Sequence, residues 1–201
     1  MTNIASCDFA NFLDIRFVMD RGIRPLWNGA PRLVGPAYTV SCPAGDNLMA
    51  HAAIYRAPAG SVVVIQGGDD RFAMAGGNVC ATARRNGIAG FVVDGLIRDE
   101  AEIVEAGFPV YCRGRGPKAG AKGEIGTLGE KIHCGGVEVH TGDIVCADED
   151  GVVIVPAADY AEVERKALER LDKESRQTLD EWAAAHRTKI DALLSERGYV
   201  G

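Results

Sequence analysis

The sequence lacks any hydrophobic run long enough to cross a membrane, and it has no closely spaced cysteine motif. Its aliphatic runs, such as residues 62–65, have the length of a strand, whereas a membrane-spanning helix needs about 20 apolar residues. The six cysteines are scattered singly without a C-x-x-C pair. We therefore expect buried thiols, and neither a zinc site nor a redox pair.

Basic residues are too few to give the chain a positive charge. Its 22 Lys and Arg residues are outnumbered by 28 Asp and Glu residues, and the formal net charge of −6 opposes broad binding to phosphate backbones. The first residues carry Asp8 and Asp14 and lack the basic and then apolar plan of a secretory signal. We expect a cytoplasmic protein with neither nucleic acid nor a membrane as its partner.

The first part of the chain alternates between apolar strands and helical segments. Apolar residues recur at helical spacing in residues 5–19, which predicts an N-terminal helix. Strands are then predicted at 33–42, 61–65, 90–93 and 109–112, and helices at 46–56, 78–86 and 99–106. Strands that are apolar throughout indicate an α/β protein whose sheet is covered on both faces.

Beyond residue 112 the pattern changes to short strands, glycine turns and finally helices. We predict strands at 124–126, 136–140, 143–147 and 151–155, with a hairpin turn at Asp150-Gly151. The apolar stripe of the C-terminal helices needs a cover, which is either the protein's own core or a neighbouring subunit. The prediction is one α/β domain with a mixed sheet at residues 1–156, followed by a C-terminal helical extension at 157–201.

A glycine turn precedes the helix predicted at 78–86. Gly76, Gly77 and Asn78 stand at its start, where glycines let an anion approach the free amides of the first helical turn. The turn is therefore a candidate site for a carboxylate or a phosphate. The alternative is that it only connects two elements.

Arg98 and Asp99 follow the strand predicted at 90–93. Arg98 can bind a carboxylate or keto oxygen through two N–H groups, and Asp99 offers hard oxygen ligands to a divalent cation. Alternatively, Asp99 caps the next helix and Arg98 is a solvated surface charge. Because ligands gather at the carboxyl ends of parallel strands, we expect this pair and the glycine turn to open on one edge of the sheet.

The run GGN…NGIAGFVVDGLIRD, with GDNL at 45–48 and DEDGVVIVP at 148–156, resembles the RraA-like family. This family contains 4-hydroxy-4-methyl-2-oxoglutarate aldolases and the regulator of ribonuclease activity A. The resemblance extends over residues 33–160, and VVDG-x-x-RD is its most specific part. It implies a swivelling β/β/α-like fold and a homotrimer or homohexamer with sites near subunit interfaces.

The resemblance further implies a metal-dependent class II aldolase that cleaves 4-hydroxy-2-oxo acids to pyruvate. In such enzymes the residue matching Asp99 anchors Mg²⁺ or Mn²⁺, and the residue matching Arg98 binds the pyruvyl group. Backbone amides matching Gly77, Asn78 and Val79 hold its carboxylate. Cleavage of a 4-hydroxy-2-oxo acid leaves the enolate of pyruvate. Decarboxylation of oxaloacetate forms the same enolate, so we expect that activity too. The alternatives are a non-catalytic regulator of a ribonuclease and an enzyme acting on another 2-oxo acid or a lactone.

Position 77 departs from the family pattern, because many aldolase members carry Asp or Glu where this chain has Gly77. The proton-transfer partner is therefore left unassigned, and metal-bound hydroxide is the candidate base because a cation lowers the pKa of its bound water. Asp46 and Asn47 either reach the rim of the site or cap the helix predicted at 46–56, and Asp94 either supports Arg98 or shapes a turn. The basic, glycine-rich residues 113–122 are either a lid that attracts an anionic substrate or a solvated loop.

Overall fold

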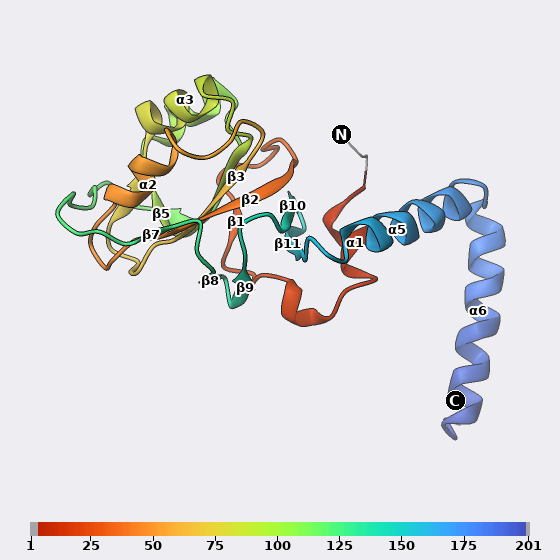
Figure 1. Ribbon diagram of the computed structural model, residues 1–201. Helices are drawn as coiled ribbons and strands as arrows, with labels where there is room; N and C mark the ends of the chain where they lie inside the picture. Colours follow the sequence, from red (N-terminus) through yellow and green to blue (C-terminus); the bar gives the residue numbers. More distant parts are fainter. Residues whose placement is uncertain (1–3, 200–201) are drawn as a thin grey trace.

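A mixed β-sheet forms the centre of the protein, whose residues 4–199 are described here from a computed structural model (Figure 1). Its strands lie in the order β1 (Arg24–Pro25), β6 (Val110–Arg115), β5 (Gly90–Ile97), β3 (Val62–Gln66), β2 (Leu33–Ser41), β10 (Ile144–Asp148) and β11 (Gly151–Val155). Short strands β4 (Ala73–Ala75) and β7 (Thr127–Leu128) pair with β5 and β2. The pairs among β2, β3, β5 and β6 are parallel, whereas β1, β7, β10 and β11 pair antiparallel.

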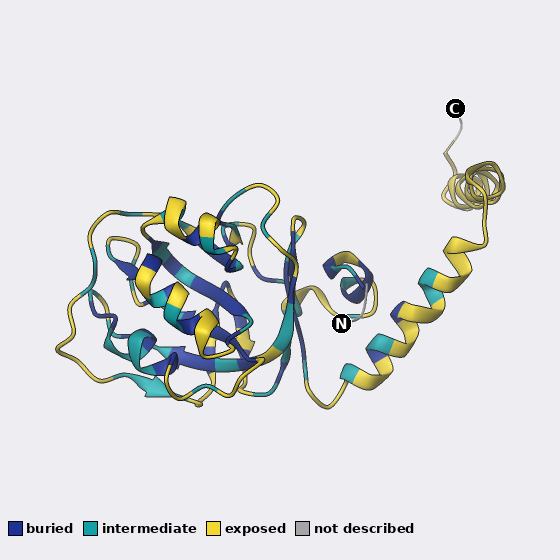
Figure 2. Cartoon of the chain, turned by 90° about the horizontal axis from the view of Figure 1, so that it is seen from above, coloured by how far each residue is buried: buried dark blue, intermediate teal, exposed yellow. Residues whose placement is uncertain are grey.

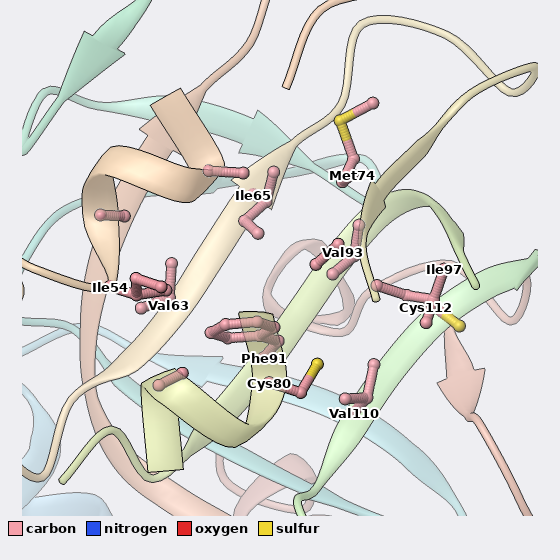
Figure 3. Close-up of a cluster of buried hydrophobic side chains, with 14 of the residues drawn as sticks. Ile54, Val63, Ile65, Met74, Cys80, Phe91, Val93, Ile97, Val110 and Cys112 are labelled. Carbon is pink, nitrogen blue, oxygen red and sulfur yellow. The ribbon is translucent and has the colours of Figure 1, made fainter. Parts of the chain in front are cut away.

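Three short helices cover one face of the parallel strands and form the larger core. They are α2 (Leu48–Ala53), α3 (Gly77–Arg85) and α4 (Glu100–Ala106). Figure 3 shows side chains from α3 and from β3, β5 and β6 in one apolar cluster, to which Ile103 of α4 also belongs. The rings of Phe91 and Phe108 make an edge-to-face contact in this cluster, with centroids 4.9 Å apart.

Truncation of Phe91 to alanine is expected to lower the free energy of unfolding by about 3–5 kcal/mol. The ring is fully buried, so its removal leaves a cavity beneath the helices that present the candidate site. Urea denaturation measures the effect. A loss below about 1 kcal/mol would show that the core collapses around the missing ring.

The opposite face of the sheet is covered by the hairpin of β8 (Ile132–Cys134) and β9 (Val137–Val139) and by the curved pair β10 and β11. Tyr111 lies fully buried among these elements, and its hydroxyl donates to the Ala147 carbonyl oxygen at 3.0 Å. The hairpin predicted before Gly151 is confirmed, since β10 and β11 pair antiparallel through Asp148 and Gly151. Gly151 has a φ of 144°, which favours glycine.

The N-terminal segment is more broken than its apolar spacing predicts. Instead of one helix over residues 5–19, it forms α1 (Ser6–Ala10) and the 3₁₀ turn η1 (Ile15–Phe17). The Asp14 side chain accepts from the Arg16 amide, and Val18 forms a bridge with Val153 of β11. Strand pairing therefore replaces helical hydrogen bonds at the end of this segment.

The C-terminal helices differ in how much of their surface is buried. Helix α5 (Tyr160–Ser175) packs Val163 and Ala167 against α1 and β11. Helix α6 (Leu179–Glu196) begins with a capping box between Thr178 and Glu181 and has no buried residue (Figure 2). Within residues 4–199, no helix has the length and the hydrophobicity that crossing a bilayer requires.

The predicted α/β fold with a mixed sheet and C-terminal helices is confirmed. The strand predicted at 124–126 is wrong, because the chain pairs with β2 slightly later, at Thr127–Leu128. Strands β1, β4 and β8 are not predicted from the sequence, because they are short and are stabilised by pairing with other strands. Cys7 is exposed, whereas the other five cysteines are buried as expected. The domain boundary at residue 156 and the homo-oligomer stay predictions.

Candidate active site

Helices α3 and α4 begin at the same edge of the sheet. Strand β4 leads into α3 and β5 leads into α4, and these two strands are parallel neighbours. The Arg98 amide donates to the Ala75 carbonyl oxygen at 3.1 Å, which ties the two loops together. The glycine turn and the Arg-Asp pair therefore lie side by side, as the rule for carboxyl ends of parallel strands predicts.

Asp99 has a left-handed backbone, with a φ of 60° and a ψ of 41°. Among residues 4–199 it is the one non-glycine residue with a positive φ. Its Oδ2 atom accepts a hydrogen bond from the Gly77 amide at 3.2 Å and lies 3.4 Å from Arg98 Nε. A non-glycine residue in this region is strained, and such strain clusters at functional sites.

Gly76 is required by the closeness of the Arg-Asp pair. A Cβ atom at this position would collide with the Asp99 carboxylate and would lie 2.9 Å from Arg98 Cγ. The backbone of the glycine turn therefore approaches these two side chains more closely than any other residue type allows.

A small cavity of about 60 Å³ opens between the glycine turn, the Arg-Asp pair and the loop that follows β6. Its lining consists of Asn47, His51, Ala73, Ala75, Gly76, Asn78, Val79, Arg98, Asp99, Ala119 and Lys122. The side chains of Arg98 and Asp99 are 44% and 38% exposed, so an entering molecule can reach them.

Of the first three backbone amides of α3, one donates a hydrogen bond and two have no acceptor among the described residues. The Gly77 amide donates to Asp99 at 3.2 Å in this structure, and its predicted contact with a substrate carboxylate stays a prediction. The amides of Asn78 and Val79 have no acceptor among the described residues. They point out of the first turn, where the helix dipole favours an anion.

Two cationic side chains line the cavity. Arg98 and Lys122 both reach it, and Lys122 comes from the basic stretch at 113–122. His51 also lines the cavity, and burial together with the charges of Lys122 and Arg98 lowers the pKa of its imidazole. His51 is therefore neutral near pH 7, and the positive charge of the cavity comes from Arg98 and Lys122.

Asn47 contributes a buried amide to the cavity wall. Its Nδ2 donates to the Ala73 carbonyl oxygen at 3.1 Å, whereas its buried Oδ1 has no hydrogen-bond donor among the described residues. Leaving such an acceptor unpaired costs about 1–3 kcal/mol. Asn47 is the N-cap residue of α2, and His51 follows one helical turn later on the same side.

Asp46 is buried and binds the loop that follows β6, and it is not part of the cavity lining. Its Oδ1 accepts from the Leu48 amide at 2.7 Å, and its Oδ2 accepts from the amides of Gly123 and Glu124 at 2.6 and 3.1 Å. Burial acts to raise the pKa of Asp46, but these three amides lower it below its usual value. Asp46 therefore holds the loop that carries Lys122 against the start of α2.

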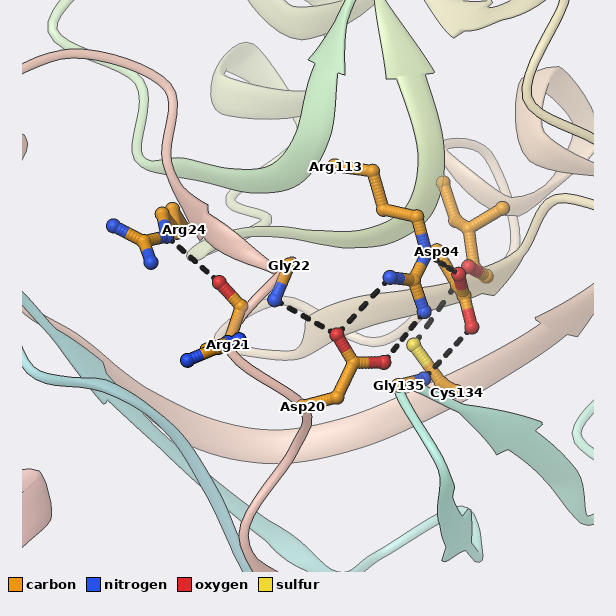
Figure 4. A network of polar contacts seen from close by, with 9 residues as sticks. Asp20, Arg21, Gly22, Arg24, Asp94, Arg113, Cys134 and Gly135 are labelled. Carbon is orange, nitrogen blue, oxygen red and sulfur yellow. Dashed lines mark hydrogen bonds and ion pairs between the residues drawn. The ribbon is translucent and has the colours of Figure 1, made fainter.

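Asp94 does not support Arg98, contrary to one of its two predicted roles. Its carboxylate pairs with Arg113 and accepts from the Gly135 amide at 2.7 Å, and Arg113 also binds Asp20 (Figure 4). These two carboxylates raise the pKa of the Arg113 guanidinium. Asp94 is not among the residues that line the cavity.

The residues present fit a hydrated divalent cation. Among residues 4–199, no group of three or more His, Cys, Asp and Glu side chains could hold a metal by itself. Magnesium, however, usually keeps several waters and takes one or two carboxylates together with substrate oxygens. Asp99, which is partly exposed on the cavity wall, suits that role. The predicted Mg²⁺ or Mn²⁺ stays a prediction.

Comparisons with known proteins identify the family. A family model described as Aldolase/RraA matches residues 5–154. The chain belongs to this family. A Halalkalibacterium halodurans protein named "Putative 4-hydroxy-4-methyl-2-oxoglutarate aldolase" is 43% identical over 179 residues, which are 89% of this chain and 81% of that protein.

Solved structures of the family share the fold of this chain. The Streptomyces coelicolor protein RraAS2, described as an unusual member of the RNase ES inhibitor RraA protein family, superimposes with a TM-score of 0.72 at 30% identity. That similarity covers 86% of this chain and 90% of RraAS2. The RNA-processing inhibitor RraA from Thermus thermophilis gives a TM-score of 0.68 at 28% identity, over 77% of this chain and 94% of that one.

Proposed function

We propose that this member of the aldolase/RraA family is a divalent-metal-dependent aldolase that releases pyruvate from 4-hydroxy-2-oxo acids. The proposal is carried by one observation, which is that Arg98, Asp99 and the free amides of Asn78 and Val79 line the same cavity. These groups match the charge and the hydrogen-bond acceptors of a 2-oxo carboxylate. The name of the Halalkalibacterium halodurans relative supports the same activity.

The substrate carboxylate binds at the start of α3 in this proposal. The amides of Asn78 and Val79 donate to its oxygens, and the positive end of the helix dipole adds favourable potential. The Arg98 guanidinium then donates to the 2-oxo oxygen. Two contacts hold Arg98 in place. Its backbone amide donates to the Ala75 carbonyl oxygen, and its Nε lies beside the Asp99 carboxylate.

The carbon–carbon bond breaks between C3 and C4. The 4-hydroxyl group loses its proton as this bond breaks, C4 becomes a carbonyl, and the electron pair of the bond moves onto C3, C2 and the 2-oxo oxygen. His51 is the neutral base that lines the cavity, and we assign the proton to it. Return of a proton to C3 gives pyruvate, so atoms and charges balance.

Negative charge develops on the 2-oxo oxygen during this step, and Arg98 is placed to stabilise it. A donor that acts mainly on developing charge lowers the barrier, and removal of one such donor typically costs about 2.7–4 kcal/mol. A cation held by Asp99 would supply further Lewis-acid stabilisation of that charge when bound. Decarboxylation of oxaloacetate forms the same enolate, so the same residues serve both reactions.

Lys122 offers a site for a second carboxylate. It lies on the loop side of the cavity, and Asp46 holds that loop through two backbone amides. A dicarboxylic substrate would then be bound between the α3 amides and Lys122. This arrangement favours dianionic over monoanionic 2-oxo acids.

Removal of divalent metal is expected to lower pyruvate release to the background rate. The assay uses 4-hydroxy-4-methyl-2-oxoglutarate and oxaloacetate, with protein dialysed against EDTA and then supplied with Mg²⁺ or Mn²⁺. The control is the same metal without protein, because metal ions alone decarboxylate oxaloacetate. Turnover that persists without metal would contradict the proposal.

Regulation of a ribonuclease by direct binding is the second candidate. It is favoured by the two solved structures described as inhibitors of RNA processing and of an RNase, which share this fold at 28% and 30% identity. Binding of this kind needs a protein surface and no cation. A stable complex with a ribonuclease that survives the loss of the Asp99 carboxylate would favour this candidate over the aldolase.

A further inference from the structure

A groove lies beside the candidate active site and shares Arg98 and Asp99 with the small cavity. Its volume is about 350 Å³, against about 60 Å³ for the cavity. The loop that follows β6 lines both, because Pro117 belongs to the wall of the groove and Ala119 to the wall of the cavity. The groove therefore adjoins the cavity along the Arg-Asp pair.

Aliphatic surface forms one wall of the groove. Ile97, Gly116 and Pro117 contribute to this wall. The Gly116 amide donates to the Ile97 carbonyl oxygen at 3.0 Å, which holds the loop against the end of β5. A Cβ atom at Gly116 would lie 2.7 Å from Leu96 Cδ1, so the loop runs in direct contact with the strand. This wall suits an alkyl group, which gains free energy when its surface leaves water.

The charged side chains of the groove form two pairs of opposite sign. Arg115 donates to Glu100 Oε1 at 2.5 Å, and Arg98 Nε lies 3.4 Å from Asp99 Oδ2. Two cations are therefore matched by two anions in the groove, whereas the lining of the cavity has two cations and one anion. The cavity attracts a carboxylate, and the groove suits an uncharged group, because a carboxylate there would lose its hydration without a free cation to pair with.

We propose that this groove binds an uncharged alkyl or aryl substituent at C4 of a 4-hydroxy-2-oxo acid. The inference rests on the proposed function and extends its substrate class. With the 2-oxo oxygen bound at Arg98, C4 lies two bonds from the 2-oxo carbon, and a substituent on C4 that passes Arg98 and Asp99 enters the groove. A substrate with two C4 substituents then places a carboxylate at Lys122 and its alkyl group in the groove.

The substituent leaves with C4 when the bond between C3 and C4 breaks. It becomes part of the released aldehyde or ketone, and pyruvate stays in the cavity. Oxaloacetate carries no such substituent, because its C4 leaves as CO₂. The size and charge of the groove therefore affect aldol cleavage and have no counterpart in the decarboxylation of oxaloacetate.

The first test compares two substrates with the wild-type protein and saturating Mg²⁺. A propyl group stands at C4 of 4-hydroxy-2-oxoheptanoate and a methyl group at C4 of 4-hydroxy-2-oxopentanoate, and each substrate releases pyruvate and an unbranched aldehyde. They differ by two methylene groups, so we expect kcat/KM to be about 10-fold higher for the heptanoate when these groups are buried. Equal values, or a lower value for the heptanoate, would overturn the inference.

The second test fills the groove. Pro117→Phe places a ring at an exposed position of its wall, so the ratio of the two kcat/KM values should fall by about 10-fold, to near unity. The matched control is Pro58→Phe, the same substitution in the exposed turn at the amino end of β3, which should keep the wild-type ratio. A Pro117→Phe protein with the wild-type melting temperature and the wild-type ratio would overturn the inference. The comparison of substrates needs no variant, so it still tests the inference if Pro117→Phe does not fold.

Oxaloacetate separates the failure of this inference from the failure of the proposed function. A wild-type protein that releases no pyruvate from oxaloacetate or from 4-hydroxy-4-methyl-2-oxoglutarate would overturn the proposed function, and the role of the groove with it. A wild-type protein that cleaves both, without a preference for the heptanoate, would overturn only the role of the groove.

Discussion

Replacement of Asp99 by asparagine is expected to lower kcat for pyruvate release by at least about 100-fold, the size of effect that follows loss of one group acting on transition-state charge. Asparagine tolerates the left-handed backbone at least as well as aspartate does, and its size is nearly the same. The loss would therefore come from the missing carboxylate charge and not from a distorted loop. Steady-state assays with saturating Mg²⁺ measure it.

The matched control for Asp99→Asn is Asp94→Asn. Asp94 lies on the same strand-to-helix segment but binds Arg113 and Gly135, away from the cavity. Its replacement should lower stability and leave kcat of the folded protein close to that of the wild type. Full activity in Asp99→Asn would remove Asp99 from the site and with it the aldolase proposal.

Replacement of Arg98 by lysine is expected to lower kcat/KM by about 100-fold, which corresponds to about 2.7 kcal/mol of transition-state stabilisation. Lysine keeps the positive charge but cannot reproduce the planar pair of N–H donors. Mn²⁺ binding without substrate should be unchanged, because Arg98 offers no oxygen ligand. An unchanged kcat/KM would show that the positive charge alone suffices and that the paired N–H donors of the guanidinium have no role.

The sequence predicts those parts of the fold that depend on local pattern. Residues 62–65 of β3 and 90–93 of β5 are apolar, and the strands predicted there are confirmed as parallel neighbours. The N-terminal helix predicted at 5–19 is wrong because Val18 gains more from pairing with β11 than from continuing a helix. Short strands such as β4 are stabilised by pairing with a neighbouring strand, so the residues of the strand itself do not predict it.

In the candidate site, too, residues in local motifs are predicted and residues placed by packing are not. Gly76, Asn78, Val79, Arg98 and Asp99 are predicted from the sequence and line one cavity in the structure. Lys122 belongs to the basic stretch 113–122, for which a lid over the site is one of the two predicted alternatives, whereas the place of His51 in the lining is not predicted because it depends on how α2 packs on the sheet. The spacing of His51, one helical turn after Asn47, was the available signal.

The position of Glu102, a residue of α4 whose carboxylate lies beside Gly77, could not be predicted from the sequence. The absence of an acid at Gly77 is visible in the sequence, but the carboxylate beside it belongs to another helix. Its place follows from the packing of α3 on α4, which no local pattern reports.

The left-handed backbone of Asp99 also sets a direction for how this scaffold can change over evolutionary time. Glycine at this position would relieve about 1 kcal/mol of backbone strain and would leave the rest of the fold intact. Under the aldolase proposal, selection for stability alone would therefore remove the proposed catalytic acid and keep the fold. A protein that uses this fold only for binding would gain stability from Asp99→Gly, so under the aldolase proposal one stabilising substitution separates a catalytic from a non-catalytic form.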